Sequence, residues 1–421
     1  LVLSGNSIAH ALVRLGGLTA GIPACPVSAN YGLLDPSFER LRHVVRRLQP
    51  GMVFVEHAAP FGRALEAVDF GDAPIVTRTP AEAPGPAIAL EEVLATPATG
   101  AVAARVASLA PGDPAACMLT SGSTGPPKIV LQSYANLAAN VAQANQALGR
   151  AACWGGTTMD WLPWSHVSGA FAPLLTLVAG GSLYIDEGKP VPGPLWEQSL
   201  QNLREVPGPY YVNVPLGYAL LADALEADAS LRATFFRELR VLLYGGAGLP
   251  APLHERLQRL AVATTGRRIA LVSAWGATET TSGCMATYFE TDRPGIGLPL
   301  PGTVAKLVPV DERYEIRIGG PIVTHGYLGD PEATAAGRDE EGFLRVGDLV
   351  SFHDAADPAQ GLAFAGRLAE EFKLGSGTWV SAGALRANLL AALGPWVGEL
   401  VVCGEGRDSI GVLAWPHRPS V

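Results

Sequence analysis

The sequence predicts an α/β protein with a large amino-terminal lobe in which mixed sheets are flanked by helices. Its 421 residues exceed what one ordinary core holds, so two or more lobes are expected. Short apolar segments alternate with helix-like segments through the first two thirds of the chain, which favours largely parallel strands. Glycine-rich loops follow several of these segments, and ligands bind at that edge of such sheets.

The predicted elements follow in order along the chain. The segment from Ser4 to Ser7 offers a cap for a helix over residues 8–15, and two further helices are predicted over residues 216–225 and 252–262. Buried strands are predicted over residues 1–3, 52–55, 116–119, 210–214, 241–244 and 269–273.

The pattern changes near Gly295, where short strands over residues 303–309 and 314–318 indicate a small β-barrel-like subdomain at about 295–365. A second change comes near Gly366, where a charged, glycine-rich segment has the composition of a hinge. A large amino-terminal domain is therefore expected over residues 1–367. Residues 368–421 are few for an independent domain, and we expect them to hold the hinge and the start of a carboxy-terminal α+β lid.

The composition excludes several classes of protein. Apolar residues make up 48% and charged residues 16%, a balance typical of folded chains. The formal net charge of -9 argues against a nucleic-acid partner. None of the five cysteines forms a C-x-x-C pair, which argues against a disulfide framework or a zinc site. Isolated thiols fit a reducing cytosol, so a cytoplasmic location is expected.

One apolar segment, residues 167–185, is nearly long enough to cross a bilayer. It contains Pro173, Gly180 and Gly181, which interrupt a spanning helix. A buried helix, a turn and a strand over residues 182–185 explain the segment better, and we expect no membrane span.

The strongest signal is a loop rich in Ser, Thr and Gly that follows the predicted strand 116–119 and ends in a lysine. Hydroxyls can donate to phosphate oxygens, glycines let backbone N–H groups approach them, and the lysine supplies a compact positive charge. The spacing is not that of a Walker loop, because Ile129 follows the lysine. A flexible surface linker is the alternative, but linkers rarely follow a buried strand directly. The loop consists of Thr120, Ser121, Gly122, Ser123, Thr124, Gly125, Pro126, Pro127 and Lys128.

This loop resembles the signature loop of the adenylate-forming superfamily, which holds acyl-CoA synthetases, luciferases and peptide-synthetase adenylation domains. Six further segments, the last ending at Lys373, resemble the same family in the same order. The resemblance implies that the loop holds the phosphates of ATP and that Lys128 is catalytic. It also implies that no side-chain nucleophile is needed, since the acid's carboxylate attacks the α-phosphorus directly.

Two of these segments imply contacts with the adenine base. Gly246, Ala247 and Gly248 follow the predicted strand 241–244 and would lie against the base, although a tight turn would suit the glycines equally well. Trp275 and Gly276 match the aromatic-Gly start of a family motif, so the indole would stack on adenine. An ordinary core tryptophan is the alternative.

The same motif and one other segment imply catalytic residues. Thr278 would bind the α-phosphate and Glu279 the magnesium ion, which prefers oxygen ligands. His166 would face the carboxylate at the acyl site, although a lone histidine is more often a surface or core residue. Residues 319–334 resemble a further family motif, to which we assign a structural role only.

The ribose contacts and the hinge are implied by the last segments. Asp348 would accept hydrogen bonds from both ribose hydroxyls, and Arg367 would contact ribose and phosphate. Family hinges carry an aspartate two residues after this arginine, where this sequence has Ala369, followed by Glu370. Lys373 aligns with the lysine of the hinge motif.

The reaction that the resemblance implies is activation of a carboxylic acid by ATP and magnesium, with AMP as the carrier, followed by transfer to coenzyme A. Segments 160–166, 184–190 and 370–381 resemble feruloyl-CoA synthetases, which implies an aromatic acid such as a hydroxycinnamate. An adenylation domain that loads a carrier protein, or a non-catalytic nucleotide-binding homologue, remain alternatives. The resemblance also implies a catalytic lysine beyond the hinge, which this sequence lacks, so we expect both ends of a longer protein to be missing and the 421 residues alone to adenylate poorly. The sequence predicts no oligomeric state.

Overall fold

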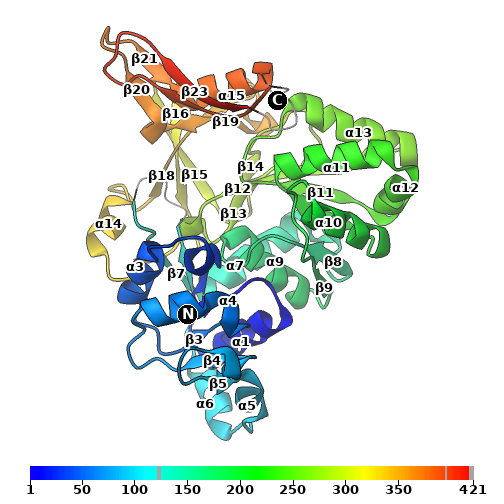
Figure 1. The fold of residues 1–421 in the computed structure, drawn as a ribbon. Helices are drawn as coiled ribbons and strands as arrows, with labels where there is room; N and C mark the ends of the chain where they lie inside the picture. Colours follow the sequence, from blue (N-terminus) through cyan, green and yellow to red (C-terminus); the bar gives the residue numbers. More distant parts are fainter. Residues whose placement is uncertain (121–124, 394–395, 417–421) are drawn as a thin grey trace.

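The computed structural model describes residues 1–120, 125–393 and 396–416 (Figure 1). Two five-stranded sheets, one four-stranded sheet and one three-stranded sheet organise most of these residues. The mixed α/β class predicted from the sequence is confirmed. The sense of the strands differs among the sheets, so the description below takes each sheet in turn.

The amino-terminal sheet is wholly parallel, in the order β2-β1-β3-β4-β5. The predicted first helix is confirmed as α1. The hydroxyl of Ser7 caps this helix by accepting from the backbone N–H of His10. The helix ends where Gly21 takes a left-handed conformation. The strands are β1 (Val2–Leu3), β2 (Pro26–Val27), β3 (Val53–Phe54), β4 (Ile75–Thr77) and β5 (Ile88–Ala89). The helices are α1 (Ile8–Ala20), α2 (Asn30–Leu33), α3 (Glu39–Leu48), α4 (Ala58–Ala67), α5 (Leu90–Ala95) and α6 (Gly100–Ser108).

The second five-stranded sheet has the order β10-β11-β12-β13-β14, with its first three strands parallel and its last two antiparallel. Helices α11 to α13 pack against it (Figure 1) around a core that includes the fully buried Tyr218 and Phe236. The strands are β10 (Tyr210–Asn213), β11 (Val241–Tyr244), β12 (Ala270–Gly276), β13 (Gly283–Ala286) and β14 (Leu298–Pro299). The helices are α10 (Pro194–Glu205), α11 (Pro215–Ala227), α12 (Ala229–Glu238) and α13 (Ala251–Thr265).

The predicted strand 116–119 is present as β6 (Pro114–Leu119), but its setting differs from the expected parallel sheet. It pairs antiparallel with β7 (Ile129–Ser133), which pairs antiparallel with β17 (Gly326–Tyr327). A parallel crossover needs about a dozen residues or more, and the loop between β6 and β7 is shorter than that. The phosphate loop therefore joins two strands of a hairpin and does not lead directly into a helix. Helix α7 (Tyr134–Ala144) begins only after β7, where Ser133 and Asn136 form a capping box.

The apolar segment 167–185 forms a helix, a turn and a strand, as predicted. Helix α9 (Val167–Val178) is followed by Gly180 in a left-handed conformation and then by β9 (Ser182–Ile185). Strand β9 pairs in parallel with β8 (Thr157–Asp160). Within the described part of the chain, no helix is long and apolar enough to cross a bilayer.

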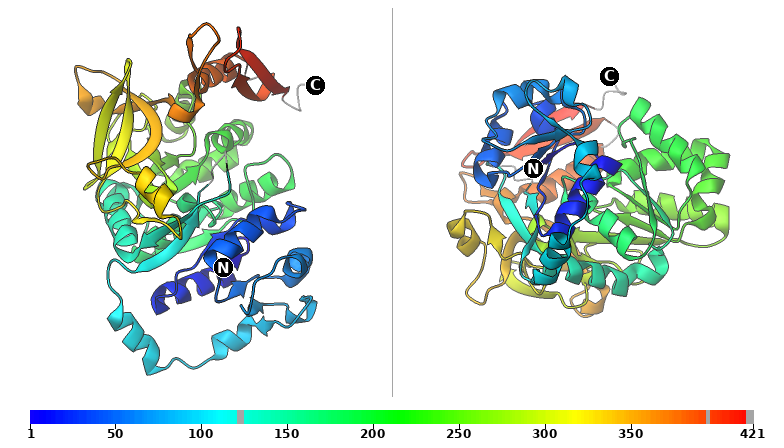
Figure 2. Two further views of the ribbon diagram at one scale, coloured as in Figure 1. Left: turned by 90° about the vertical axis from the view of Figure 1, so that its left-hand side faces the viewer. Right: turned by 90° about the horizontal axis from the view of Figure 1, so that it is seen from below.

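The four-stranded sheet is antiparallel, in the order β15-β16-β18-β19. A shared core packs it against β13, with Met285, Ile316 and Val350 fully buried. Carboxy-terminal elements follow it, at the opposite end of the molecule from the amino-terminal sheet (Figure 2). The remaining elements are β15 (Val304–Val310), β16 (Arg313–Gly319), α14 (Pro331–Ala336), β18 (Leu344–Phe352), β19 (Leu362–Arg367), β20 (Glu371–Lys373), β21 (Trp379–Ser381), α15 (Ala382–Leu393), β22 (Val397–Cys403) and β23 (Gly411–Pro416).

Candidate active site

The two ends of the phosphate loop are tied to each other. The backbone N–H of Thr120 donates to the carbonyl of Lys128 at 3.0 Å, and the N–H of Lys128 donates to Oγ1 of Thr120 at 3.0 Å. Both residues are thereby held where the loop leaves the two strands of the hairpin, and Gly125 of the same loop lines a pocket together with Thr120. The four predicted residues between them, Ser121, Gly122, Ser123 and Thr124, lie outside the described residues.

The side chain of Lys128 lies on the face of an aromatic ring. Its Nζ is 4.7 Å from the ring centroid of Tyr327, and the hydroxyl of Tyr327 donates to Oε1 of Glu279 at 2.7 Å. Burial and the charge of Glu279 raise the pKa of Tyr327 well above its usual value, so the hydroxyl keeps its proton. Tyr327 thus links Lys128 and Glu279, although it lies in the segment that was predicted to have a structural role only.

Glu279 stands on a tightly held turn. Its carbonyl accepts from the backbone N–H of Thr324 at 2.9 Å. The side-chain amide of Gln132 donates to the carbonyls of Thr278 at 3.3 Å and of Thr281 at 3.1 Å. Because Thr281 has a positive φ of 66°, which a β-branched residue rarely adopts, these bonds and the packing around them hold a strained backbone. Such over-determined turns are common where a side chain must be aimed at a ligand.

The predicted base and ribose residues form a second cluster. Oδ2 of Asp348 accepts from Nε1 of Trp275 at 3.1 Å, and its Oδ1 lies 3.3 Å from Nε of Arg367. Asp348 and Arg367 are direct partners across β18 and β19, so the sheet register places them together. Burial raises the pKa of Asp348, while Arg367 and Trp275 oppose that rise. Trp275 and Gly276 belong to β12, which extends beyond the predicted strand 269–273.

The glycine-rich loop after β11 lies at the same edge of the sheet as Trp275. Tyr244 at the end of β11 is in register with Ser273 of β12, so the loop begins beside the part of β12 that continues to Gly276. Gly246 has a positive φ of 79°, and Gly246, Ala247 and Gly248 are exposed. The loop lies against β12 at Gly245, where an added Cβ would be 3.1 Å from the carbonyl oxygen of Ala274, the residue before Trp275.

His166 lies in a pocket of about 760 Å³ that also includes Thr120 and Gly125. It precedes α9, and although much of its side chain is exposed, the atoms packed around the ring lower its pKa. The loop before it is held by Asn6, whose Nδ2 donates to the carbonyl of Leu162 at 2.8 Å and whose Oδ1 accepts from the N–H of Trp164 at 2.9 Å. Asn6 was missed because the sequence pattern around it indicates only a helix cap.

The donor set around Glu279 fits a magnesium ion that retains water. No cluster of three or more His, Cys, Asp or Glu side chains suited to a metal occurs among the described residues. One carboxylate is nevertheless sufficient for magnesium in nucleotide sites, because the ion keeps several waters and binds phosphate oxygens. Glu279 is the residue that would hold the ion.

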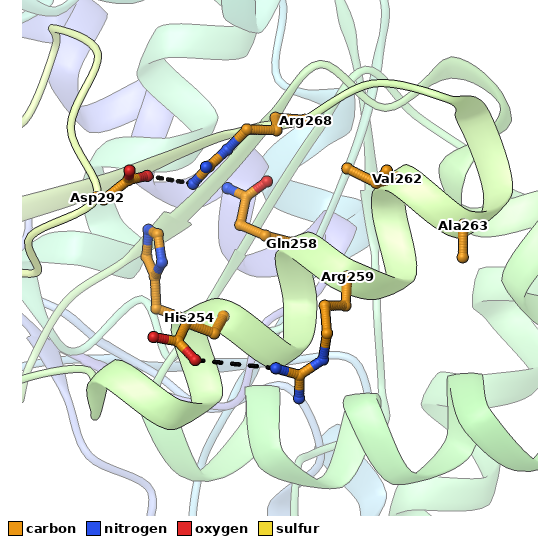
Figure 3. Close-up of a pocket in the computed structure, with 8 residues that line it drawn as sticks. His254, Gln258, Arg259, Val262, Ala263, Arg268 and Asp292 are labelled. Atoms are coloured by element: carbon orange, nitrogen blue, oxygen red, sulfur yellow. Dashed lines mark hydrogen bonds and ion pairs between the residues drawn. The ribbon is translucent and has the colours of Figure 1, made fainter.

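A second pocket, of about 570 Å³, lies away from these clusters on α13 (Figure 3). Its guanidinium groups are already paired, since Arg268 forms an ion pair with Asp292, and Arg259 lies 3.8 Å from Glu255. None of the residues predicted to bind ATP lines this pocket. It is therefore not assigned to the site.

Comparison with known proteins identifies one family and several proteins to which this chain is similar. The profile of the family described as AMP-binding enzyme matches residues 1–328. A long-chain-fatty-acid–CoA ligase of Thermus thermophilus is 27% identical over 72% of this chain and 56% of that protein. An isonitrile lipopeptide synthase of Streptomyces coeruleorubidus is 30% identical over 95% of this chain and 26% of that protein. A malonyl-CoA ligase solved as a ternary product complex with methylmalonyl-CoA and AMP is 28% identical, with a TM-score of 0.67 over 100% of this chain and 83% of that chain.

Proposed function

Because this chain belongs to the AMP-binding enzyme family, we propose that it activates a carboxylic acid with ATP, forms the acyl-AMP with release of pyrophosphate, and passes the acyl group to coenzyme A. The chain spans 56% of the length of the Thermus ligase, so the activity of the whole protein is part of the proposal. The Thermus ligase and the malonyl-CoA ligase are both named as ligases that join an acid to coenzyme A, which supports this class of reaction, whereas the lipopeptide synthase carries a different name.

One observation carries the proposal: the cluster around Asp348 and the cluster around Glu279 are joined by one short segment, which runs from Trp275 to Glu279. Trp275, near the end of β12, lies beside Asp348, and Glu279 follows after one short turn and contacts Tyr327, which also contacts Lys128. A nucleotide has the same order, from base and ribose to phosphates and metal. Trp275 and Asp348 would hold the nucleoside, and Lys128 and Glu279 would face the triphosphate.

In the proposed reaction, an oxygen of the acid's carboxylate attacks the α-phosphorus of ATP in line, and the bond to the pyrophosphate oxygen breaks. The chain's own work is alignment of two anions and neutralisation of developing charge. Lys128 and the hydroxyls of the phosphate loop would bind phosphate oxygens, and Thr278 would contact the α-phosphate. A magnesium ion, when bound at Glu279, would neutralise charge on the leaving pyrophosphate.

The nucleoside end would be bound by several groups together. Trp275 would stack on adenine, with Gly246, Ala247 and Gly248 against the other side of the base. Asp348 would accept from the ribose hydroxyls and Arg367 would contact ribose and phosphate. Separately, His166 would face the carboxylate of the acid from the pocket that it shares with the phosphate loop.

The narrower proposal concerns the acid. Segments 160–166, 184–190 and 370–381 support an aromatic acid such as ferulate. The names of the relatives described above do not point to one class of acid, since one is named for long-chain fatty acids and another was solved with methylmalonyl-CoA. The choice of acid therefore depends on a direct assay.

The test is acid-dependent ATP–pyrophosphate exchange by the purified full-length protein, followed by thioester formation when coenzyme A is added. The panel of acids contains ferulate, benzoate, malonate, a medium-chain and a long-chain fatty acid, and amino acids. Exchange and thioester formation with ferulate would support both proposals, whereas turnover with another acid only would keep the reaction and reject the aromatic acid. Exchange without transfer to coenzyme A would indicate a carrier-protein acceptor, and ATP binding without exchange would overturn the proposed reaction.

A further inference from the structure

Tyr327 is anchored on two sides within the candidate site. Its strand β17 pairs with β7, with Tyr327 opposite Val130, so it lies beside the strand that Lys128 precedes. On the other side its backbone N–H donates to Oγ1 of Thr334 in α14 at 3.0 Å. Gly326 before it allows this approach, because a Cβ there would lie 2.4 Å from Cγ2 of Thr334. The ring is therefore a fixed feature against which neighbouring side chains are placed.

The ring lies between two opposite charges. Its face contacts the ammonium of Lys128 and its hydroxyl contacts the carboxylate of Glu279. Within the part of the chain that the structure describes, no ion pair joins Lys128 to Glu279 within 4.0 Å. Each of the two charges therefore contacts Tyr327 and not the other charge.

We propose that Tyr327 is a positioning residue that separates Lys128 from Glu279 and orients both. This inference rests on the proposed function. The ammonium stays available to phosphate oxygens, and the carboxylate, held by one hydrogen bond at Oε1, keeps Oε2 available to a divalent cation. A direct pair would satisfy each charge with the other and would have to break before ATP and magnesium bind.

The two contacts suit this role because they differ in strength and direction. A cation–π contact of an exposed lysine is weak, so the ammonium can move from the ring to phosphate without losing a strong partner. The hydroxyl of Tyr327 keeps its proton and donates to the carboxylate of Glu279. It therefore orients the carboxylate and, unlike a lysine, does not neutralise its charge. In this role Tyr327 itself would touch neither the reacting atoms nor the metal.

The first test is Tyr327→Phe, which removes the hydroxyl and keeps the ring. Titration calorimetry would measure ATP affinity in EDTA and then across a magnesium series. We expect metal-free ATP affinity to be unchanged and the half-saturating magnesium concentration to rise about tenfold, as loss of a hydrogen bond to a charged group implies. The matched control is Tyr288→Phe, whose hydroxyl donates to the carbonyl of Pro299 at 2.9 Å and should leave both values unchanged.

The second test removes the ring with Tyr327→Leu, in the natural background and in a Glu279→Gln background. Leucine should lower metal-free ATP affinity about fivefold when Glu279 is present, because Lys128 can then pair with the carboxylate. The same change should have little effect in the Glu279→Gln background. A merely structural role for the ring would give equal losses in both backgrounds.

The outcomes separate this inference from the proposed function. If the natural protein binds ATP and catalyses exchange, yet Tyr327→Phe leaves its magnesium dependence unchanged, the role of Tyr327 is overturned and the proposed function stands. If the natural protein fails to bind ATP, both are overturned. Should Tyr327→Leu fail to fold by circular dichroism, the magnesium titration of Tyr327→Phe decides the question alone.

Discussion

Two lysines of this protein lie on aromatic rings beside a carboxylate, and they differ in one respect. Lys306 lies 5.3 Å from the ring centroid of Phe343 and also pairs directly with Asp339 at 2.8 Å. Lys128 lies 4.7 Å from the ring centroid of Tyr327, which stands between it and Glu279. The ammonium of Lys306 is neutralised by a carboxylate of the protein. The ammonium of Lys128 contacts only the aromatic ring among these groups, and in the proposed function it would bind a phosphate group of ATP.

Asp339 and Asp348, in and beside the four-stranded sheet, differ in the same way as the two lysines: the first has its charge paired within the protein, and the second has fewer partners. Asp339 accepts at Oδ2 from Lys306 and Arg317, and at Oδ1 from two backbone N–H groups. Hydrogen bonds from Lys306 and Arg317 lower its pKa. Asp348 has one hydrogen bond from Trp275 and a longer contact with Arg367, and burial raises its pKa. A carboxylate such as that of Asp339, whose two oxygens each accept two hydrogen bonds, indicates a structural role. A carboxylate such as that of Asp348, which can accept further hydrogen bonds, indicates a residue that binds a ligand.

The largest expected effect comes from comparing the two lysines. Lys128→Ala should lower acid-dependent ATP–pyrophosphate exchange by about 100-fold to 1,000-fold, because a preorganised charge at developing phosphate charge is lost. Its thermal stability should change little, since the side chain is exposed. Lys306→Ala should do the reverse and lower stability while leaving exchange unchanged. Exchange assays and thermal unfolding of both variants check the pair, and equal loss of exchange in both would remove the distinction.

The second prediction concerns Asp348. Asp348→Asn should weaken ATP binding about tenfold to 100-fold, since a charged acceptor for the ribose hydroxyls is lost. Because the folded-state pKa of Asp348 is raised, its ionised form costs stability at neutral pH, and that cost disappears as the pH falls below the usual aspartate value. The variant should therefore be at least as stable as the natural protein at pH 7, with the difference vanishing in acid. Calorimetric ATP titration and urea unfolding at several pH values measure both.

Asp339 should respond with the opposite sign. Its folded-state pKa is lowered, so the stability that it contributes is present above the usual value of 3.8 and is lost as the pH falls through the folded-state value. Asp339→Asn should lower the urea midpoint at pH 7, and the deficit should shrink only below the usual aspartate pKa. ATP affinity should not change. A loss of ATP affinity equal to that of Asp348→Asn would contradict the structural role of Asp339.

These pairs also show which features the sequence could predict. The local pattern was sufficient for β11, which is present over the predicted residues 241–244, and for the strand that precedes the phosphate loop. It was insufficient for the sense of that strand, because pairing partners are chosen by the whole chain. The predicted site residues Trp275, Asp348 and Arg367 do meet, but sheet register brings them together.

Tyr327 shows the limit most clearly. Its contacts with Lys128 and Glu279 join three segments that are distant in the sequence, and each contact depends on the pairing of β17 with β7. No spacing or periodicity reports such a meeting, since a Gly-Tyr pair in a short strand is an ordinary turn or packing signal. The sequence shows which residues carry charge, but the structure is needed to show which charged groups form ion pairs and which do not.

The smallest expected effect concerns Asn6, a fully hydrogen-bonded side chain that holds the loop before His166, the residue proposed to face the acid. Asn6 uses both ends of its amide on the backbone of the loop before His166. Asn6→Ala should cost about 1–2 kcal/mol of stability, the usual cost of unpaired backbone groups, measured by urea unfolding. Because the loop carries His166, KM for the acid should rise while KM for ATP stays the same. A parallel rise in both constants would show that the loop supports the nucleotide site as well, and an unchanged KM for the acid would place His166 outside the acyl pocket.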